Sequence, residues 1–168
     1  MSADEAIRDV QDAKAIGIDA FAVNVQNTQD PWAVNSIKYI FDAAEKNNFK
    51  LFFSFDMAVR DQVSYFLPVF VQYHNSAAYY KHNNLPFVST FWGATLSFGY
   101  STPNQGWQTQ LRDALNAQGI PIYFVPSFSN APNGPSNFFQ TYPVSSLFDI
   151  CAWDSEAYSN SLGCRWCL

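Results

Sequence analysis

Short apolar runs alternate along this chain with longer segments whose hydrophobic residues recur every three or four positions. The runs at residues 20–25 and 51–56 are apolar or small over most of their length, which is typical of strands buried on both faces of a sheet. The segments between such runs carry one apolar stripe each and favour amphipathic helices. Repeated strand-then-helix units predict a parallel sheet, which is either wound and open or closed as a barrel.

The first expected helix has recognisable signals at both ends. Ser2 and Glu5 have the spacing of a capping box, and Gly17 is suited to end the helix. Three apolar residues at helical spacing form its buried stripe: Ala6, Val10 and Ala13.

Three further helices are expected before residue 120. One begins with Asp30 as its cap and Pro31 in its first turn. Its buried stripe consists of Ala33, Ile37, Ile40, Phe41 and Ala44. Residues 59–82 are expected to be helical with an interruption near Pro68, and Trp107–Gln118 forms a helix that Gly119 ends.

The expected strands lie in sequential order at residues 20–25, 50–56, 86–91, 121–126 and 149–153. A loop rich in Pro, Asn, Ser and Gly covers residues 126–137, and a short helix follows at Asn137–Leu147. A complete barrel needs eight strands and typically about 250 residues. We therefore expect an α/β fold, an incomplete (β/α)8 TIM-type barrel with parallel strands, over residues 1–156 and an atypical tail at 157–168. Its open sheet edges are expected to favour self-association.

Composition and charge narrow the functional classes. The 168 residues are 18% aromatic and only 14% charged, which suits an extracellular enzyme that stacks sugars on aromatic rings, although an aromatic-rich core would give the same numbers. The net charge is −5 and the nine Lys and Arg residues form no basic run, which argues against a nucleic-acid partner. No apolar stretch has the length of a membrane helix, and the N-terminus does not have the pattern of a signal peptide.

The cysteines and histidines do not form a metal pattern. Cys164 and Cys167 make a lone CxxC, with Cys151 as an odd third thiol. Zinc would need four ligands, and His74 and His82 lack the matching spacing, so no metal is expected.

Polar residues gather where the expected strands end. They are Asn24, Asp56, Thr90, Ser127 and Asp154. A barrel builds its active site from the carboxyl ends of its strands, so these residues form the candidate site. No GxGxxG or P-loop follows any strand, so a nucleotide-binding fold lacks its signature.

Glycoside hydrolysis requires two carboxylates. Position leaves three candidates among the acidic residues: Asp56, Asp154 and Glu156. Asp56 follows a buried run directly and is the best of the three, although it could instead cap the next helix. Asp154 and Glu156 are weaker candidates, because the chain after Trp153 has an irregular pattern that favours a solvated loop.

Four aromatic residues are candidates for sugar stacking: Trp92, Trp107, Trp153 and Tyr100. Core packing is the alternative for each of them.

Three segments together resemble glycoside hydrolase family 71, the fungal α-1,3-glucanases or mutanases. They read GIDAFAVNV, AAEKNNFKLFFSFDM and YYKHNNLPFVSTFWG, and the resemblance runs from about residue 4 to residue 153. It implies a secreted (β/α)8 enzyme that hydrolyses cell-wall α-1,3-glucan with inversion and without a metal or organic cofactor. Asp56 matches the Asp of the family's FSFDM segment. The resemblance therefore implies a substrate-site role for Asp56. Asn24 and Thr90, from their strand-end positions, and the aromatic residues Trp92 and Trp153 are the substrate-binding candidates.

The chain departs from the family pattern in four places. The barrel strand that should precede the first helix and the family's later Trp-Asn-Asp-Tyr-Gly-Glu segment have no counterpart in it. Trp92 stands before Gly93 where the family often has Glu, and the tail SNSLGCRWCL does not resemble the family. Three hypotheses therefore stay open: an α-1,3-glucan hydrolase, a non-catalytic fragment that at most binds glucan, and an unrelated α/β protein.

Overall fold

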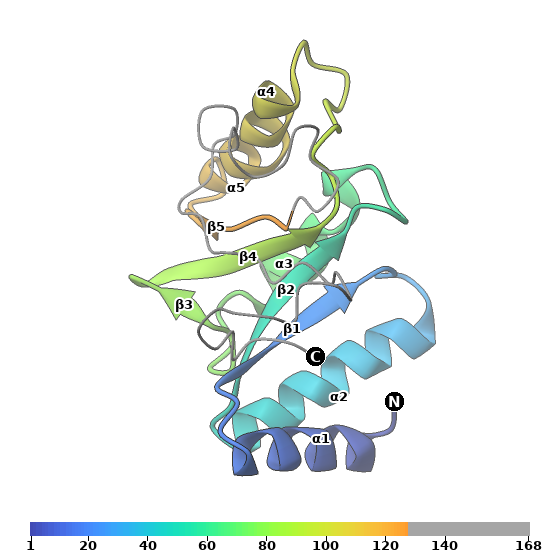
Figure 1. Cartoon of the computed structure of the whole chain (residues 1–168), viewed down its shortest axis with the longest axis vertical. Coiled ribbons are helices and arrows are strands. Elements are labelled where there is room, and N and C mark those ends of the chain that lie inside the picture. Colours follow the sequence, from blue (N-terminus) through green and yellow to red (C-terminus); the bar gives the residue numbers. More distant parts are fainter. Residues whose placement is uncertain (128–168) are drawn as a thin grey trace, which may run out of the picture.

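The computed structural model describes residues 1–127, which form a mainly parallel sheet with helices packed against it (Figure 1). The strands are β1 (Ala20–Val25), β2 (Lys50–Asp56), β3 (Lys81–His82), β4 (Leu85–Phe91) and β5 (Tyr123–Phe124). The helical segments are α1 (Ala3–Ala15), α2 (Pro31–Lys46), the 3₁₀ turn η1 (Val63–Tyr65), α3 (Leu67–Tyr73), α4 (Pro103–Trp107), the π-helical η2 (Gln108–Asp113) and α5 (Ala114–Asn116). The loop, helix and strand expected beyond residue 127 lie outside the described residues.

The sheet confirms the expected parallel order of the first four predicted strands. β1 pairs with β2, β2 with β4 and β4 with β5, and each pairing is parallel. Within residues 1–127 no strand pairing closes the sheet on itself. The described part is therefore an α/β unit with a parallel sheet.

Helix α1 begins as its sequence predicts. Ser2 Oγ accepts from the backbone N–H of Glu5 at 3.3 Å, and the Glu5 carboxylate accepts from the Ser2 N–H at 2.6 Å. These two bonds satisfy donors that a helix start otherwise leaves unpaired. The predicted stripes of α1 and α2 are both buried, and the two helices pack against each other.

The start of α2 is placed correctly, but its cap works differently. Asp30 occupies the N-cap position without a side-chain bond to the helix. Its carboxylate instead accepts from Asn27 Nδ2 at 2.7 Å. The Asp30 side chain therefore shapes the loop before the helix.

The two faces of the sheet differ in chemistry because side chains alternate along a strand. One face carries Leu51, Phe53 and Phe55 of β2, each fully buried. Aromatic rings from α2 and α3 pack there: Phe55 lies 4.9 Å from Phe66 and Phe53 lies 5.4 Å from Phe41 between ring centroids. This face holds the main hydrophobic core. The opposite face carries Ser54 and Asp56 together with Phe52, whose ring packs on Phe87 at 4.7 Å between centroids.

Strands β2 and β4 pair directly only in their carboxyl-terminal halves. Residues 53–56 lie in register with residues 88–91. Before that point the segment 78–80 lies between the two strands: Tyr80 N–H donates to Leu51 O at 2.7 Å, and Phe87 N–H donates to Tyr80 O at 3.0 Å. The fully buried Tyr79 hydroxyl donates to Phe87 O at 3.0 Å and accepts from Phe53 N–H at 3.3 Å. Both strands thus keep their backbone groups bonded where they separate.

The expected helix over residues 59–82 is wrong. The chain forms only η1 and the seven-residue α3, and it then turns into β3, which pairs antiparallel with the start of β4. Pro68 starts α3 and does not interrupt a longer helix, since proline fits a first helical turn. Asn83 and Asn84 have φ of 50° and 64°, which is the geometry of a two-residue hairpin turn.

The helix predicted at Trp107–Gln118 begins earlier, at Pro103. Thr102 caps it by accepting from the Gln105 N–H at 3.2 Å. The helical segment includes the π turn η2 and finishes before Gly119, whose φ is 74°. The expected stop at Gly119 is therefore confirmed.

Substitutions at Asn84 test the hairpin turn. Asn84→Gly should leave the free energy of unfolding unchanged or raise it by up to about 1 kcal/mol, because glycine adopts positive φ freely. Asn84→Val should lower it by about 1–2 kcal/mol. Urea unfolding measures both, and equal stabilities of the two variants would contradict the turn.

Tyr79→Phe tests the bridge between β2 and β4. Removing the hydroxyl leaves a buried N–H and a buried carbonyl without their partner, so the free energy of unfolding should fall by about 1–3 kcal/mol. Tyr39→Phe is the matched control, because the Tyr39 hydroxyl makes no hydrogen bond within residues 1–127. Equal melting temperatures for the two variants in calorimetry would show that the bridge does not stabilise the sheet.

Candidate active site

The candidate site lies on the polar face of the sheet, at the carboxyl end of β2. Asn24, Ser54 and Ser89 are in register across β1, β2 and β4, so they form one polar row on this face. Asp56 is on the same face as Ser54, two residues further along β2. Its side chain is only 3% exposed.

The Asp56 carboxylate is held through both oxygens. Asn24 Nδ2 donates to Oδ2 at 3.1 Å, and the Ala58 N–H donates to Oδ1 at 3.1 Å. The second bond closes a turn directly after the strand, because an Asp side chain can accept from the backbone two residues on. No helix starts at this turn, since the next helical residue is Val63. The alternative that Asp56 caps the following helix is therefore wrong.

Thr90 is fully buried and does not reach the Asp56 face. It is in register with Phe55, so its side chain lies on the face of the hydrophobic core. Its hydroxyl donates to the carbonyl oxygen of Trp92 at 3.1 Å. Thr90 thus helps to shape the turn after β4.

Trp92 is the exposed aromatic residue at the end of β4. Its side chain is 44% exposed and its φ is 65°, a conformation rare for a bulky residue. Gly93 follows with φ of 104°, and a Cβ there would lie 2.7 Å from the buried Trp107 ring. Trp107 Nε1 donates to Gly93 O at 3.0 Å, so this tight turn fixes the backbone that presents Trp92.

The loops after β1 and β2 are joined by Tyr65, which the sequence did not single out. Its hydroxyl accepts from the Thr28 N–H at 3.1 Å and donates to Asn27 Oδ1 at 3.3 Å. The Arg60 guanidinium lies 4.8 Å from the centroid of the Tyr65 ring. The hydrogen bond from Thr28 lowers the pKa of Tyr65 below its usual value, and the charge of Arg60 acts in the same direction. This contact orders the rim beside the site.

The remaining sequence candidates take packing roles or lie elsewhere. Trp107 is fully buried in the core, and Tyr100 is half-buried, with its hydroxyl accepting from Gln110 Nε2 at 3.1 Å. The ring of His74 packs on Phe70. The residues outside the described part of the chain are Trp153, Asp154, Glu156 and the three cysteines Cys151, Cys164 and Cys167. The sequence candidates that suit a site are therefore Asp56, for its two hydrogen bonds, and the exposed residues Asn24 and Trp92.

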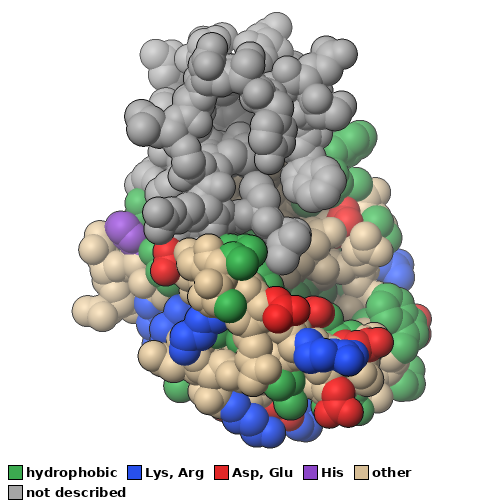
Figure 2. All heavy atoms as spheres, turned by 60° about the horizontal axis from the view of Figure 1, so that its bottom comes forward, with side chains coloured by type: hydrophobic (Ala, Val, Ile, Leu, Met, Phe, Trp, Pro, Cys, Tyr) green, Lys and Arg blue, Asp and Glu red, His purple; other side chains and the backbone are tan. Residues whose placement is uncertain are grey.

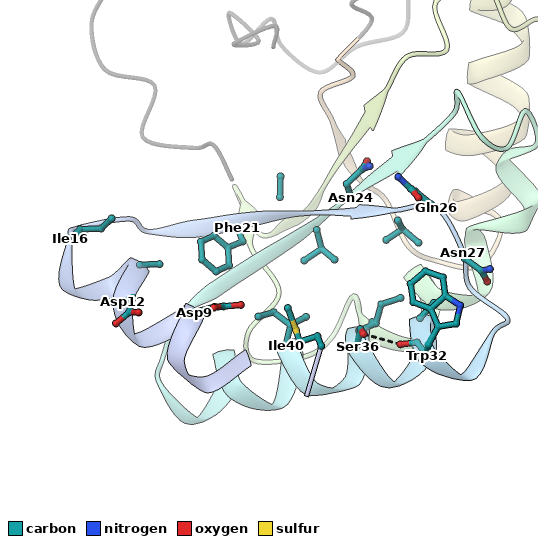
Figure 3. A pocket seen from close by; sticks show the side chains of 17 residues that line it. Asp9, Asp12, Ile16, Phe21, Asn24, Gln26, Asn27, Trp32, Ser36 and Ile40 are labelled. Carbon is teal, nitrogen blue, oxygen red and sulfur yellow. Dashed lines mark hydrogen bonds between the residues drawn. The ribbon is translucent and has the colours of Figure 1, made fainter. Parts of the chain in front are cut away.

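A groove of about 550 Å³ runs along the helix side of β1, and Asn24 of the candidate site is among the residues that line it. Phe21, Trp32 and Ile40 line it, and Figure 3 shows Asn24 and Gln26 on the other side of the strand from Phe21. Its walls are mainly apolar, although six polar residues also line it: Asp9, Asp12, Asn24, Gln26, Asn27 and Ser36. Asp56, the carboxylate at the end of β2, is not among its lining residues. The polar face is the better candidate.

The described surface carries side chains of both charges. Figure 2 shows Lys and Arg side chains interspersed with Asp and Glu on the face that carries α1 and α2. Within residues 1–127, there is no group of three or more His, Cys, Asp or Glu side chains that could hold a metal ion. None of the helices in this part of the chain is long and apolar enough to cross a bilayer.

Comparison with known proteins identifies the family. The profile of glycosyl hydrolase family 71 matches residues 1–163. A glucan endo-1,3-alpha-glucosidase of Schizosaccharomyces pombe is 40% identical over 129 residues, which are 75% of this chain and 30% of the relative. An ascus wall endo-1,3-alpha-glucanase of the same yeast is 35% identical over 91% of this chain and 35% of its own length.

A mutanase of Penicillium rubens is 28% identical over 88% of this chain and 30% of its own length. The chain thus spans about a third of the length of these relatives. The match over nearly the whole chain confirms the resemblance seen in the three sequence segments, and the chain belongs to glycosyl hydrolase family 71.

Proposed function

We propose that this protein takes part in the hydrolysis of α-1,3-glucan, as an α-1,3-glucanase that acts on fungal cell-wall glucan outside the cell. The names of the two yeast relatives, at 40% and 35% identity, support this substrate. The observation that carries the proposal is the Asp56 carboxylate, which two N–H donors hold at the carboxyl end of a parallel sheet. That end of a (β/α) barrel is where its enzymes carry their active sites.

The parallel sheet is proposed to be one section of a (β/α)8 barrel. Strands β1, β2, β4 and β5 follow one another in chain order, as barrel strands do. The polar row of Asn24, Ser54 and Ser89 would then face the barrel interior below Asp56, and the aromatic face would carry the outer helices.

The proposed chemistry requires a second carboxylate besides Asp56. In an inverting glycosidase, one carboxylic acid protonates the leaving oxygen and the other carboxylate activates water, at a separation of about 6.5–9.5 Å. Asp56 accepts two hydrogen bonds, which suits a carboxylate that orients a sugar hydroxyl or stabilises charge. Asp154 and Glu156 stay the proposed partners. Asn24 and Trp92, and with them Trp153, are the proposed contacts of the sugar.

A non-catalytic protein that only binds glucan is the second candidate. The observation that favours it is the length of the chain, which spans about a third of its enzymatic relatives. Reducing-sugar release from insoluble α-1,3-glucan separates the two candidates. Binding to the polymer without release of sugar would support the second.

Asp56→Asn tests the role of the carboxylate. Turnover should fall by at least about a hundredfold, the usual scale for a positioned acid or base. The melting temperature should change little, because an amide oxygen can still accept from the Ala58 N–H and the Asn24 amide can flip to pair with the new group. The control is Asp42→Asn, which removes only an exposed ion pair with Lys38 on α2 and should keep full turnover. Near-normal turnover of the Asp56 variant would remove this residue from the site.

Trp92→Ala tests the proposed stacking platform. Loss of one aromatic contact should weaken binding to soluble α-1,3-linked oligosaccharides about 2–10-fold in calorimetric titration. Trp32→Ala is the matched control, because Trp32 is 64% exposed but lines the groove on the helix side of β1. An equal effect of both substitutions would show that Trp92 has no special role.

A further inference from the structure

Asn24 makes a contact that its place in the sheet does not require. Asn24 is the penultimate residue of β1, it is exposed, and its partner in register on β2 is Ser54. The Asn24 amide nevertheless reaches diagonally along the sheet to Asp56, and its Nδ2 lies 3.1 Å from Oδ2. An exposed asparagine gains little from burial, so this directed bond is the main interaction of its side chain.

The two hydrogen bonds on Asp56 come from different parts of the fold. The Ala58 N–H belongs to the turn after β2 and holds Oδ1, whereas Asn24 belongs to the neighbouring strand and holds Oδ2. One bond alone leaves the carboxylate free to rotate about the bond between Cβ and Cγ. Two bonds to two different oxygens fix its plane. Each oxygen still has a lone pair for a sugar hydroxyl or a water molecule.

We infer that Asn24 is a positioning residue that orients the Asp56 carboxylate toward the substrate. This inference rests on the proposed function. The donor is a neutral amide, so it fixes the orientation without cancelling the negative charge that the carboxylate presents. A Lys or Arg in its place would pair with that charge and compete with the substrate for it.

Two variants of Asn24 separate positioning from packing. Asn24→Ala removes the side chain, and Asn24→Asp keeps its shape but replaces the donor by a second carboxylate oxygen. Positioning predicts that kcat on a soluble α-1,3-linked oligosaccharide falls about tenfold or more in both variants, because a hydrogen bond to a charged group is lost. KM should change less than kcat, and Asn24→Asp should be at least as impaired as Asn24→Ala. A packing role predicts the reverse order, with Asn24→Asp close to the unmodified protein.

Asn35→Asp is the matched control for the added charge. Asn35 is exposed on α2, the helix that packs on the core side of the sheet, and its substitution should leave kcat unchanged. Wild-type turnover in Asn24→Asp would overturn the inference.

A spectroscopic test of the same contact does not depend on activity. In ¹⁵N-labelled protein, one Asn24 side-chain amide proton should resonate downfield and exchange slowly, because it is bonded to a carboxylate. Asp56→Ala should abolish this signature, and Asp42→Ala should preserve it. If Asp56→Ala does not fold, Asp56→Asn serves instead and should shift the same proton upfield.

The two experiments also separate the inference from the proposed function. If the unmodified protein neither binds nor hydrolyses the glucan, the proposed function fails and the spectroscopic test alone decides the contact. An Asn24 amide that is unchanged when Asp56 is replaced would overturn the positioning role in either case.

Discussion

The arrangement of β2 and β4 rests on the insertion of residues 78–80 between their amino-terminal halves. Parallel strands that separate inside a core would leave backbone groups unbonded, which costs free energy. Here the segment around Tyr79 takes up those groups, and burial raises the pKa of the Tyr79 hydroxyl far above its usual value, so that it stays a donor. Direct pairing is then confined to residues 53–56 and 88–91. This half of the sheet ends at Asp56, so the site lies where β2 and β4 are bonded directly to each other.

The same pairing places the main hydrophobic core on one face of the sheet and the candidate site on the other. Phe53 and Phe55 face the aromatic core, whereas Ser54 and Asp56 between and after them face the other way. Shifting β2 by one residue would exchange the two sets, which would bury the carboxylate among phenyl rings. The register that keeps the core apolar is therefore also the register that presents Asp56.

The sequence predicts most of the elements because strong local patterns decide them. β1, β2 and β4 are mainly apolar runs, the capping box of α1 forms as predicted, and the apolar stripes of α1 and α2 are both buried. After Asp56, Val63, Phe66, Val69 and Phe70 recur at helical spacing, which favours one long helix, yet they are distributed over a 3₁₀ turn, the residue that follows it and a short helix. The Asn83–Asn84 pair was the available hairpin signal, weaker than Asn-Gly and set among polar residues.

The site was only partly predictable, for a physical reason. A residue at a strand end can be found from sequence, and Asp56 was found in this way. The direction of its neighbours depends on register, which no local pattern specifies. Thr90 was therefore expected beside Asp56, although its position opposite Phe55 turns it into the core. The contact of Tyr65 with Asn27 and Thr28 joins two loops about 38 residues apart, and neither segment carries a sequence pattern that predicts this contact.

The turn after β4 has a consequence for how this protein can change. A Cβ at Gly93 would meet the ring of Trp107 at 2.7 Å and the side chain of Met57 at 3.2 Å, and the backbone beside Gly93 holds Trp92 at a positive φ that its own side chain disfavours. The backbone of Trp92 is also held by its own hydrogen bonds, from its N–H to Ser127 O at 3.0 Å and from the Thr90 hydroxyl to its carbonyl oxygen at 3.1 Å. The buried residue Trp107 thus contributes to the backbone conformation of the exposed residue Trp92. A substitution at the buried position can therefore change the surface without altering any solvent-exposed residue.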